Sequence, residues 1–320
     1  MLNALFTECF LSKSDVRKLG RHGVKIIEAS GNLDESEIIK KLKDIDIYII
    51  GGTDKATENV IKNTNLKLII FYGTGYENHI DINAASHKGI QAANTPKANA
   101  YTVAEHCVAL ILDAVKQITY LNNSSKLGIW RQREAWNLEN KTLGIVGMGT
   151  IGGCVARIMK NGFGMKVIYN NRGKREDLEK QLDAHKVDLQ TLLKTSDVVS
   201  VNASYSDESV EILNANNLGL VKKGAVLVCT SRAELIDPRA LKKALTRGNL
   251  SCAAFDSYYK EPLPSKNDDK WGLLSFPDNK FIITPHTAYG SREAIENMNR
   301  MVIDNLISFI KTGQPKYKVT

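Results

Sequence analysis

Three side chains that could act together in catalysis each follow a predicted strand in the last third of the chain. Arg232 follows Ala225–Cys229, Glu261 follows Leu250–Asp256, and His286 comes at the end of Phe281–Thr284. In an open parallel sheet, ligands bind beyond the carboxyl ends of the strands, which meet at one edge. The sequence therefore predicts that an arginine, a carboxylate and a histidine converge at that edge.

This set suits the reduction of a carbonyl group beside a carboxylate. Arg232 could hold the substrate carboxylate through a planar, two-pronged hydrogen bond, and His286 could donate a proton to the carbonyl oxygen as a hydride arrives. Glu261, if it pairs with His286, would favour the protonated imidazole. Each residue also has a structural interpretation: the histidine as a hydrogen-bonding group, the arginine as a cap or a partner of Asp237, the glutamate as a turn residue before Pro262.

A glycine-rich turn in the middle of the chain indicates where a hydride carrier would bind. The turn Gly147–Gly152 joins the apolar run Leu143–Val146 to a helical stretch, Cys154–Lys160, and a second apolar run follows at Met165–Tyr169. Strand, glycine turn, helix and strand form the pattern of a dinucleotide-binding βαβ unit. The alternative is an ordinary glycine loop.

Each glycine of this turn has a physical task in the dinucleotide interpretation. Gly147 would allow the tight turn, Gly149 would let the diphosphate approach the backbone, and Gly152 would let helix and strand pack closely. The free N–H groups at the helix N-terminus, from Thr150 and Ile151, would then face the diphosphate.

The end of the second strand favours NADP(H) over NAD(H). An NAD site usually carries an acid here to bind the ribose 2′-hydroxyl. This chain instead has Asn170, Asn171 and Arg172, with Lys174 and Arg175 close behind. An arginine can bind a 2′-phosphate that a carboxylate would repel. We predict cofactor contacts from Asn171, Arg172 and Lys174, with NAD(H) as the second choice; the alternative is a solvated basic turn that binds nothing.

Composition narrows the class of protein. The chain has 320 residues, 43% of them hydrophobic and 24% charged, which is ordinary for a globular protein of two domains. The formal net charge of +8 is scattered along the chain, so nucleic-acid binding is not expected. No apolar run is long enough to cross a bilayer, and the N-terminus lacks the basic region of a signal peptide. We expect a cytoplasmic protein that does not bind membranes.

The cysteines argue against a disulfide framework or a metal site. Their number is odd and they form no CxxC pair: Cys9, Cys107, Cys154, Cys229 and Cys252. This pattern is typical of a reducing compartment.

The elements that must position these residues alternate between strand and helix. Early strands are predicted at Ala4–Phe6, Val24–Glu28, Ile45–Ile50, Leu68–Phe71 and Ile90–Ala93, with helices at Lys13–Gly20, Glu35–Lys43 and Glu58–Asn63; Asp197–Val201 is a further late strand. The alternation predicts an α/β protein of two doubly wound parallel-sheet domains, a flavodoxin-like substrate domain and a Rossmann cofactor domain, with a cleft between them.

The domain boundaries follow from two long helical stretches. Ala98–Leu121 is predicted as one helix leading to the cofactor domain, and Ser291–Lys311 as a helix that returns to the first domain. We expect a discontinuous substrate domain of residues 1–99 and 289–320 and a cofactor domain of residues 100–288. The segment Lys126–Asn140, with two tryptophans, is either an interface arm or a loop packed on its own domain.

Six motifs in the right order resemble the D-isomer-specific 2-hydroxyacid dehydrogenases. They are FYGTGYENHID (71–81), NTPKANAYTVAEHCVALIL (94–112), GIVGMGTIG (144–152), TSRAELIDPRAL (230–241), FDSYYKEPLP (255–264) and TPHTAYGS (284–291). The resemblance covers nearly the whole chain. It implies that Arg232, Glu261 and His286 are the catalytic residues.

The resemblance also implies further contacts. The backbone of Gly73, Thr74 and Gly75 would meet the substrate carboxylate, together with the side chains of Arg232 and His286. Residues on the cofactor side of the site would be Thr102, Asn202, Thr230 and Asp256. A homodimer formed through the cofactor domains is the usual assembly in the family.

The sequence departs from the family pattern at three places. It has Ala233 after the arginine where glycine is usual, Asn202–Ser206 where His-Leu-Pro-Leu-Thr is common, and Ser257-Tyr258 where Val-Phe follows the aspartate. Asn171 and Arg172 resemble the NADPH-preferring glyoxylate and hydroxypyruvate reductases.

These observations predict an NADP(H)-dependent reduction of a small 2-oxo acid, similar to glyoxylate or hydroxypyruvate, to the D-2-hydroxy acid. Two alternatives stay open: a cofactor-sensing binding protein similar to corepressors on the same fold, and a dehydrogenase for a larger or phosphonate-bearing 2-oxo acid. Formate is disfavoured because Glu261 stands where formate enzymes of this family carry glutamine.

Overall fold

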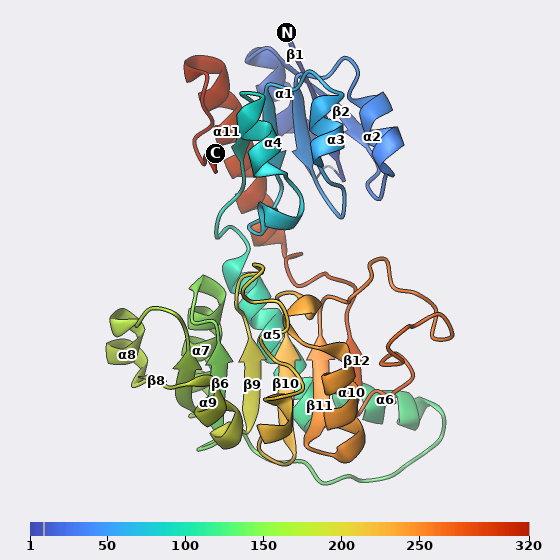
Figure 1. Cartoon of the computed structure of the whole chain (residues 1–320), viewed down its shortest axis with the longest axis vertical. Helices are drawn as coiled ribbons and strands as arrows, with labels where there is room; N and C mark the ends of the chain where they lie inside the picture. The colour runs from blue at the N-terminus through green and yellow to red at the C-terminus, as the bar shows by residue number, and fades with distance from the viewer. Residues whose placement is uncertain (9, 320) are drawn as a thin grey trace. The chain divides into compact units, whose positions relative to one another are not determined.

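The computed structural model describes residues 1–8 and 10–319, so Cys9 lies outside the described residues. The chain forms two compact units (Figure 1). The first consists of Met1–Asn99 and Gly290–Thr320, and the second of Ala100–Tyr289. The second unit thus ends one residue later than the boundary expected from the sequence.

The first unit is a parallel five-stranded sheet with the strand order β2-β1-β3-β4-β5. Its elements are β1 (Leu2–Thr7), α1 (Lys13–Arg21), β2 (Val24–Ala29), α2 (Glu35–Lys41), β3 (Ile47–Ile50), α3 (Glu58–Lys62), β4 (Leu68–Phe71), η1 (Tyr76–Asn78), α4 (Ile82–His87), β5 (Gln91–Ala93) and α11 (Arg292–Thr312). The order is flavodoxin-like. Helices α2, α3 and α4 cover one face, and α1 and α11 cover the other (Figure 1).

Buried polar side chains bind the C-terminal helix to this unit. The amide of Asn299 donates to the carbonyl of Phe10 at 2.8 Å, and its oxygen accepts from the hydroxyl of Tyr72 at 2.7 Å. Asn305, which is fully buried, donates to the carbonyl of Asn94 at 3.0 Å. A buried amide must find such partners, and these partners place the helix on the unit formed by the first hundred residues.

The second unit is a parallel seven-stranded sheet with the strand order β12-β11-β10-β9-β6-β7-β8. Its elements are α5 (Ala100–Lys116), α6 (Ile118–Lys126), β6 (Thr142–Val146), α7 (Thr150–Phe163), β7 (Lys166–Asn170), α8 (Glu176–Leu182), β8 (His185–Lys186), α9 (Leu189–Thr195), β9 (Val198–Val201), η2 (Leu218–Leu220), β10 (Ala225–Cys229), η3 (Ala233–Leu235), α10 (Pro238–Arg247), β11 (Leu250–Phe255) and β12 (Phe281–Ile283).

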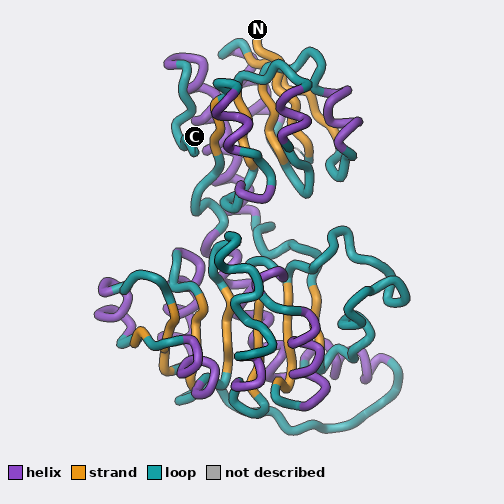
Figure 2. The backbone as a smooth tube through the Cα atoms, viewed as in Figure 1, coloured by secondary structure: helices purple, strands orange, loops and turns teal. Residues whose placement is uncertain are grey.

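This order is that of a Rossmann sheet, and it reverses direction at the neighbouring strands β6 and β9. Strands β9 and β10 are buried along their whole length; β10 is a continuous apolar run, and β9 is apolar apart from the buried Ser200. Helices α5 and α7 pack on one face of the sheet and α9 and α10 on the other, as the backbone trace in Figure 2 also shows. The predicted α/β class with two doubly wound parallel sheets is confirmed.

The prediction of one helix over Ala98–Leu121 is wrong, because the chain breaks at Gln117. Gln117 has a φ of +57°, in the left-handed region. The carboxylate of Asp113 accepts hydrogen bonds from both the N–H and the hydroxyl of Thr119, at 2.8 and 2.5 Å. These hydrogen bonds provide a partner for a free N–H group at the start of α6. The helix α5 therefore ends at Lys116.

The two tryptophans between α6 and β6 have opposite environments. Trp136 packs against the core of the second unit, and its carbonyl accepts from the ammonium of Lys116 at 2.8 Å. Trp130 is 86% exposed. The segment is thus anchored to its own unit at one end. Among the described residues, no helix combines the length and apolar character needed to span a membrane.

Candidate active site

Arg232, Glu261 and His286 come together beyond the carboxyl ends of β10, β11 and β12. Nδ1 of His286 lies 2.8 Å from Oε2 of Glu261. On the other side of the ring, Nε2 lies 3.5 Å from Nη1 of Arg232. The structure therefore brings together the three residues that the sequence predicted, here named the Arg–Glu–His cluster.

Glu261 is held in its position by the backbone as well as by the histidine. Its Oε1 accepts a hydrogen bond from the N–H of Tyr258 at 2.9 Å. Burial raises the pKa of this carboxyl. The raising effect is outweighed by three groups that lower the pKa: His286 through its hydrogen bond and charge, Tyr258 through its N–H, and Arg232 through its charge. The pKa of Glu261 thus lies below its ordinary value of 4.5, and the group is a carboxylate at neutral pH.

His286 has an unusual backbone conformation that a neighbouring carboxylate stabilises. Its φ is +51°, a region that non-glycine residues seldom adopt. Asp256, at the end of β11, accepts hydrogen bonds from the N–H groups of Thr287 and Ala288 at 3.0 and 2.9 Å and from the hydroxyl of Thr284 at 2.6 Å. Asp256 thus bonds to residues on both sides of His286 and fixes the turn.

His106, which the sequence reasoning did not identify, completes this network from α5. Its Nε2 lies 3.0 Å from the hydroxyl oxygen of Thr284 and 3.4 Å from Oδ1 of Asp256. Because the Thr284 hydroxyl donates its single proton to Asp256, Nε2 of His106 carries the proton between the two side chains. The only sequence signal was its position inside the 94–112 motif.

The glycine turn has the geometry that a bound diphosphate requires. Gly147 has a φ of +94°, and a Cβ atom there would lie 2.4 Å from the backbone nitrogen of Ala203. A Cβ atom at Gly152 would lie 2.3 Å from the carbonyl oxygen of Gly147. At Gly149, in contrast, a Cβ atom would meet nothing within 4 Å, so this position is open. Gly149 precedes α7, which starts at Thr150 and Ile151 without a side-chain cap.

Two buried polar atoms beyond the carboxyl ends of β9 and β10 have no nitrogen or oxygen partner among the described residues, although the second of them faces the buried thiol of Cys107. They are Oδ1 of Asn202 and the hydroxyl oxygen of Thr230. The N–H of Asn202 donates to the carbonyl of Val146, the residue before the turn, at 2.8 Å. Because buried polar groups normally have partners, these two atoms fit a polar ligand at the turn. The residues present therefore fit a dinucleotide.

The basic turn after β7 is largely exposed. Nη1 of Arg172 lies 3.5 Å from Glu208, and both side chains are more than 80% exposed. Lys174 pairs with Glu179 at 3.2 Å, and the amide of Asn171 donates to the carbonyl of Gly173 at 3.1 Å. Exposed pairs of this kind are weak, so the arginine and lysine can exchange their partners for a phosphate.

Comparison with known proteins decides the family. A model described as "D-isomer specific 2-hydroxyacid dehydrogenase, NAD binding domain" matches residues 108–288. The glyoxylate reductase of Thermococcus litoralis is 32% identical over 318 aligned residues, which cover 93% of each chain. The chain belongs to the D-isomer-specific 2-hydroxyacid dehydrogenase family. The resemblance inferred from the motifs is confirmed, and the protein is an NAD(P)-dependent oxidoreductase.

Solved structures of other proteins share its whole fold. A glyoxylate reductase from Paecilomyes thermophila is 29% identical, with a TM-score of 0.84, over 99% of this chain and 98% of the other. An acyclic imino acid reductase, solved in complex with NADPH and D-Arg, is 26% identical with a TM-score of 0.87 over 100% of both chains. The matched residues 108–288 include the glycine turn and the Arg–Glu–His cluster of this 2-hydroxyacid dehydrogenase.

The remaining predicted site residues lie elsewhere in this dehydrogenase. The Gly73–Gly75 loop belongs to the first unit, where the carbonyl of Gly73 accepts from the N–H of Thr95 at 3.0 Å and the carbonyl of Thr74 accepts from Asn94 at 2.9 Å. These contacts fix the loop. Its contact with substrate stays a prediction, as does that of Thr102 in α5 with the cofactor.

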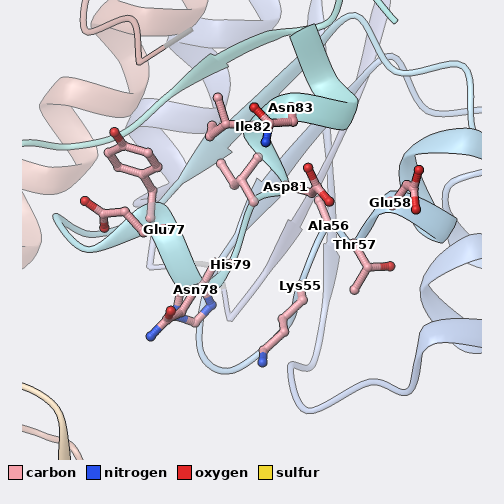
Figure 3. A pocket seen from close by; sticks show the side chains of 12 residues that line it. Lys55, Ala56, Thr57, Glu58, Glu77, Asn78, His79, Asp81, Ile82 and Asn83 are labelled. Atoms are coloured by element: carbon pink, nitrogen blue, oxygen red, sulfur yellow. The ribbon is translucent and has the colours of Figure 1, made fainter. Parts of the chain in front are cut away.

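An open hollow of about 570 Å³ lies next to this loop in the first unit (Figure 3). Lys55, Glu77, Asn78 and His79 are among the side chains that line it. Its lining includes Tyr76–Asp81 from the 71–81 motif. It includes none of the residues to which the sequence assigns substrate binding or catalysis. We therefore assign the chemistry to the Arg–Glu–His cluster and not to this hollow. Within the described residues, no group of three or more His, Cys, Asp or Glu side chains is arranged to hold a metal ion.

Arg175 has a structural role that the sequence did not predict. Its guanidinium donates to the carbonyl of Met148 at 2.6 Å, inside the glycine turn, and pairs with Asp177 at 3.0 and 3.1 Å. It therefore ties the basic turn to the glycine turn. In this dehydrogenase, Arg172 and Lys174 remain the cations that project into solvent.

Proposed function

We propose that the protein catalyses the NADP(H)-dependent reduction of a small 2-oxo acid, such as glyoxylate or hydroxypyruvate, to the D-2-hydroxy acid. The observation that carries the proposal is the histidine ring held between Glu261 on Nδ1 and Arg232 near Nε2. The D configuration follows from the family. The choice of a small substrate is supported by the glyoxylate reductases among the relatives.

The chain's own residues would divide the work as follows. A bound reduced nicotinamide supplies the hydride. The Arg232 guanidinium would bind the substrate carboxylate and orient the adjacent carbonyl. Nε2 of His286 would donate the proton to the carbonyl oxygen, because Nδ1 is occupied by Glu261. Glu261 would fix the orientation of the imidazole and place a negative charge beside it.

Asp256 would act on the reaction through the turn that holds His286. Its carboxylate is 2% exposed and accepts three hydrogen bonds from that turn. A direct contact between Asp256 and the cofactor stays a prediction. We propose that its main role is to position the histidine.

The preference for NADP(H) rests on charge at the end of β7. Arg172 and Lys174 would bind the 2′-phosphate, with Asn171 beside the ribose. The glycine turn, with Thr150 and Ile151 at the N-terminus of α7, would bind the diphosphate, and Asn202 and Thr230 would donate or accept hydrogen bonds deeper in the site. The NADPH bound to the similar imino acid reductase supports this choice.

The two units would carry the two halves of the function. The family match supports the second unit as the dinucleotide-binding domain, and we propose that the first unit, through Gly73, Thr74 and Gly75, binds the substrate. The homodimer and the cytoplasmic location remain predictions from the sequence and the family.

The test is an NADPH-oxidation assay over a series of 2-oxo acids of increasing size, from glyoxylate upward. We expect the highest kcat/KM with glyoxylate or hydroxypyruvate. In His286→Asn we expect kcat to fall about 100-fold or more, and in Arg232→Lys we expect a rise in KM with a fall in kcat, because lysine lacks the planar fork. The exposed His185, changed to asparagine, is the matched control.

The outcomes of this screen separate the proposed reaction from its alternatives. Turnover only with large or phosphonate-bearing acids would reassign the substrate. Tight NADPH binding without turnover of any acid would favour the cofactor-sensing protein. Full activity in His286→Asn would contradict the role given to the imidazole.

A further inference from the structure

Five cationic side chains gather on the solvent side of α10 and on the loop beside it. Four of them are spaced three and four residues apart along the helix: Arg239, Lys242, Lys243 and Arg247. This spacing places them on one helical face. The opposite face carries the buried apolar residues Ala240, Leu241, Ala244 and Leu245. The fifth cation, Lys270, comes from the segment between β11 and β12.

These cations surround a hollow of about 490 Å³, here named the α10 hollow. Its lining consists of Arg239, Lys242, Lys243, Thr246, Arg247, Lys270 and Trp271. The ammonium of Lys270 lies 4.5 Å from the centre of the Trp271 ring, and the guanidinium carbon of Arg239 lies 5.7 Å from it. A Cβ atom at Gly272 would lie 2.6 Å from Nζ of Lys242, so this ammonium rests directly on the loop. The lining contains no acid.

The positive charge of the α10 hollow is not balanced by nearby carboxylates. None of the five cations forms an ion pair with any Asp or Glu in residues 1–8 and 10–319. The acids closest in sequence are used elsewhere: Asp237 caps α10, Asp268 bonds Ser265, and Asp269 accepts from Tyr258, Trp271 and Leu274. Like charges three and four residues apart on a helix repel one another. An anion in the hollow would relieve this repulsion.

We propose that the α10 hollow binds a small anion that carries several phosphate groups. Lysine ammonium groups attract phosphate as point charges, and arginine adds a two-pronged hydrogen bond. The volume matches sites for small molecules. The cations occupy one ten-residue helix and one adjacent loop position, which is too short a stripe to follow a nucleic-acid backbone across the surface. The site shares no residue with the Arg–Glu–His cluster or the glycine turn.

The test uses the full chain with its cofactor site saturated by NADP⁺ or NAD⁺, so that the glycine turn cannot bind the probe. Inorganic tripolyphosphate is titrated by calorimetry at low salt. In parallel, the fluorescence of Trp271 is recorded in the Trp130→Phe/Trp136→Phe variant, in which it is the remaining tryptophan. We expect one saturable site per chain and a change in Trp271 emission with the same midpoint.

Matched charge-removal variants decide the location of the site. Lys242→Gln/Lys243→Gln/Arg247→Gln should weaken tripolyphosphate binding by about tenfold or more, since each lost phosphate contact removes a charge-assisted hydrogen bond. Arg21→Gln/Lys40→Gln/Lys41→Gln removes the same charge from exposed positions in the first unit and should change the affinity less than about twofold. Circular dichroism melts confirm that both variants are folded.

Three results would overturn the proposal. They are the absence of saturable binding, equal weakening by both triple variants, and unchanged binding in the α10 variant. A single-stranded oligonucleotide that binds the α10 hollow more tightly than tripolyphosphate would also overturn it and would assign the surface to nucleic acid. None of these readouts depends on turnover, so they stand apart from the substrate screen.

Discussion

Oδ1 of Asp256 accepts a hydrogen bond from the hydroxyl of Thr284 at 2.6 Å, two residues before the histidine of the Arg–Glu–His cluster. The same carboxylate accepts from the N–H groups of Thr287 and Ala288, just after that histidine. The left-handed conformation of His286 is thus enclosed by bonds to one buried side chain. This relationship links the end of β11 to the geometry of the proposed proton donor.

Asp256→Asn should loosen this turn. A single amide oxygen cannot accept from donors on both sides of the carboxylate, so at least one buried N–H loses its partner, at a cost of about 1–3 kcal/mol. We expect kcat to fall about tenfold or more, while the KM for the cofactor changes little. Thr284→Ser, which keeps the hydroxyl, should stay close to wild type, whereas Thr284→Val should resemble Asp256→Asn.

The pKa of Glu261 predicts a pH dependence of stability. Because folding lowers this pKa below 4.5, the unfolded chain binds more protons in the acidic range. The stabilisation from Glu261 is therefore complete above pH 4.5 and is lost as the pH falls through the lower pKa of the folded state. The difference in unfolding free energy between the wild type and Glu261→Gln should shrink from pH 6 to pH 3, as urea denaturation can measure. A difference that grows on acidification would contradict the assignment.

Gly149→Ser should separate cofactor binding from stability. No atom lies within 4 Å of a Cβ atom at this position, and serine is a favourable residue at a helix N-terminus. The unfolding free energy should therefore stay within about 0.5 kcal/mol of the wild type or rise. The side chain would occupy the space that the diphosphate needs, so the cofactor Kd should rise about tenfold or more. Gly147→Ala is the contrasting variant, because its Cβ atom would clash with Ala203, and it should lose stability.

Arg172→Ala should lower kcat/KM with NADPH about tenfold or more and leave the value with NADH within about twofold, because NADH has no 2′-phosphate. Glu208→Gln is the control, since it removes the exposed partner of Arg172 without removing the cation. It should keep or increase the preference for NADPH. An equal fall in kcat/KM with NADPH and NADH in Arg172→Ala would show that the arginine does not bind the 2′-phosphate.

Three cysteines should resist alkylation in the native protein. Burial raises the pKa of Cys107 to about 11 and the pKa values of Cys229 and Cys252 to about 12. The reactive thiolate is therefore scarce at neutral pH, and solvent access is closed. Iodoacetamide at pH 7.5 followed by peptide mass spectrometry should find these three residues unmodified until urea unfolds the chain. Rapid modification of any of them in buffer would contradict this expectation.

Much of the fold could be predicted from local pattern. The strand β4 and the strand β10 lie at the residues predicted for them, because buried parallel strands are short, continuous apolar runs. Helix boundaries that depend on a hydrogen bond between a side chain and the backbone could not be predicted. The break at Gln117 is an example, since it depends on whether Asp113 bonds Thr119 or faces solvent.

By itself the sequence determined the α/β class, the glycine turn, the family motifs and the convergence of Arg232, Glu261 and His286. The class, the turn and the convergence follow from local periodicity and from the rule that parallel strands end at a common edge, whereas the motifs rest on resemblance to the family. Only the tertiary structure decided that Asp256 and His106 enclose the turn of His286, that Arg175 points into the glycine turn, and that Lys270 and Trp271 face the cations of α10. Such contacts join residues far apart in the chain, and they depend on the direction of each side chain, which periodicity alone does not specify.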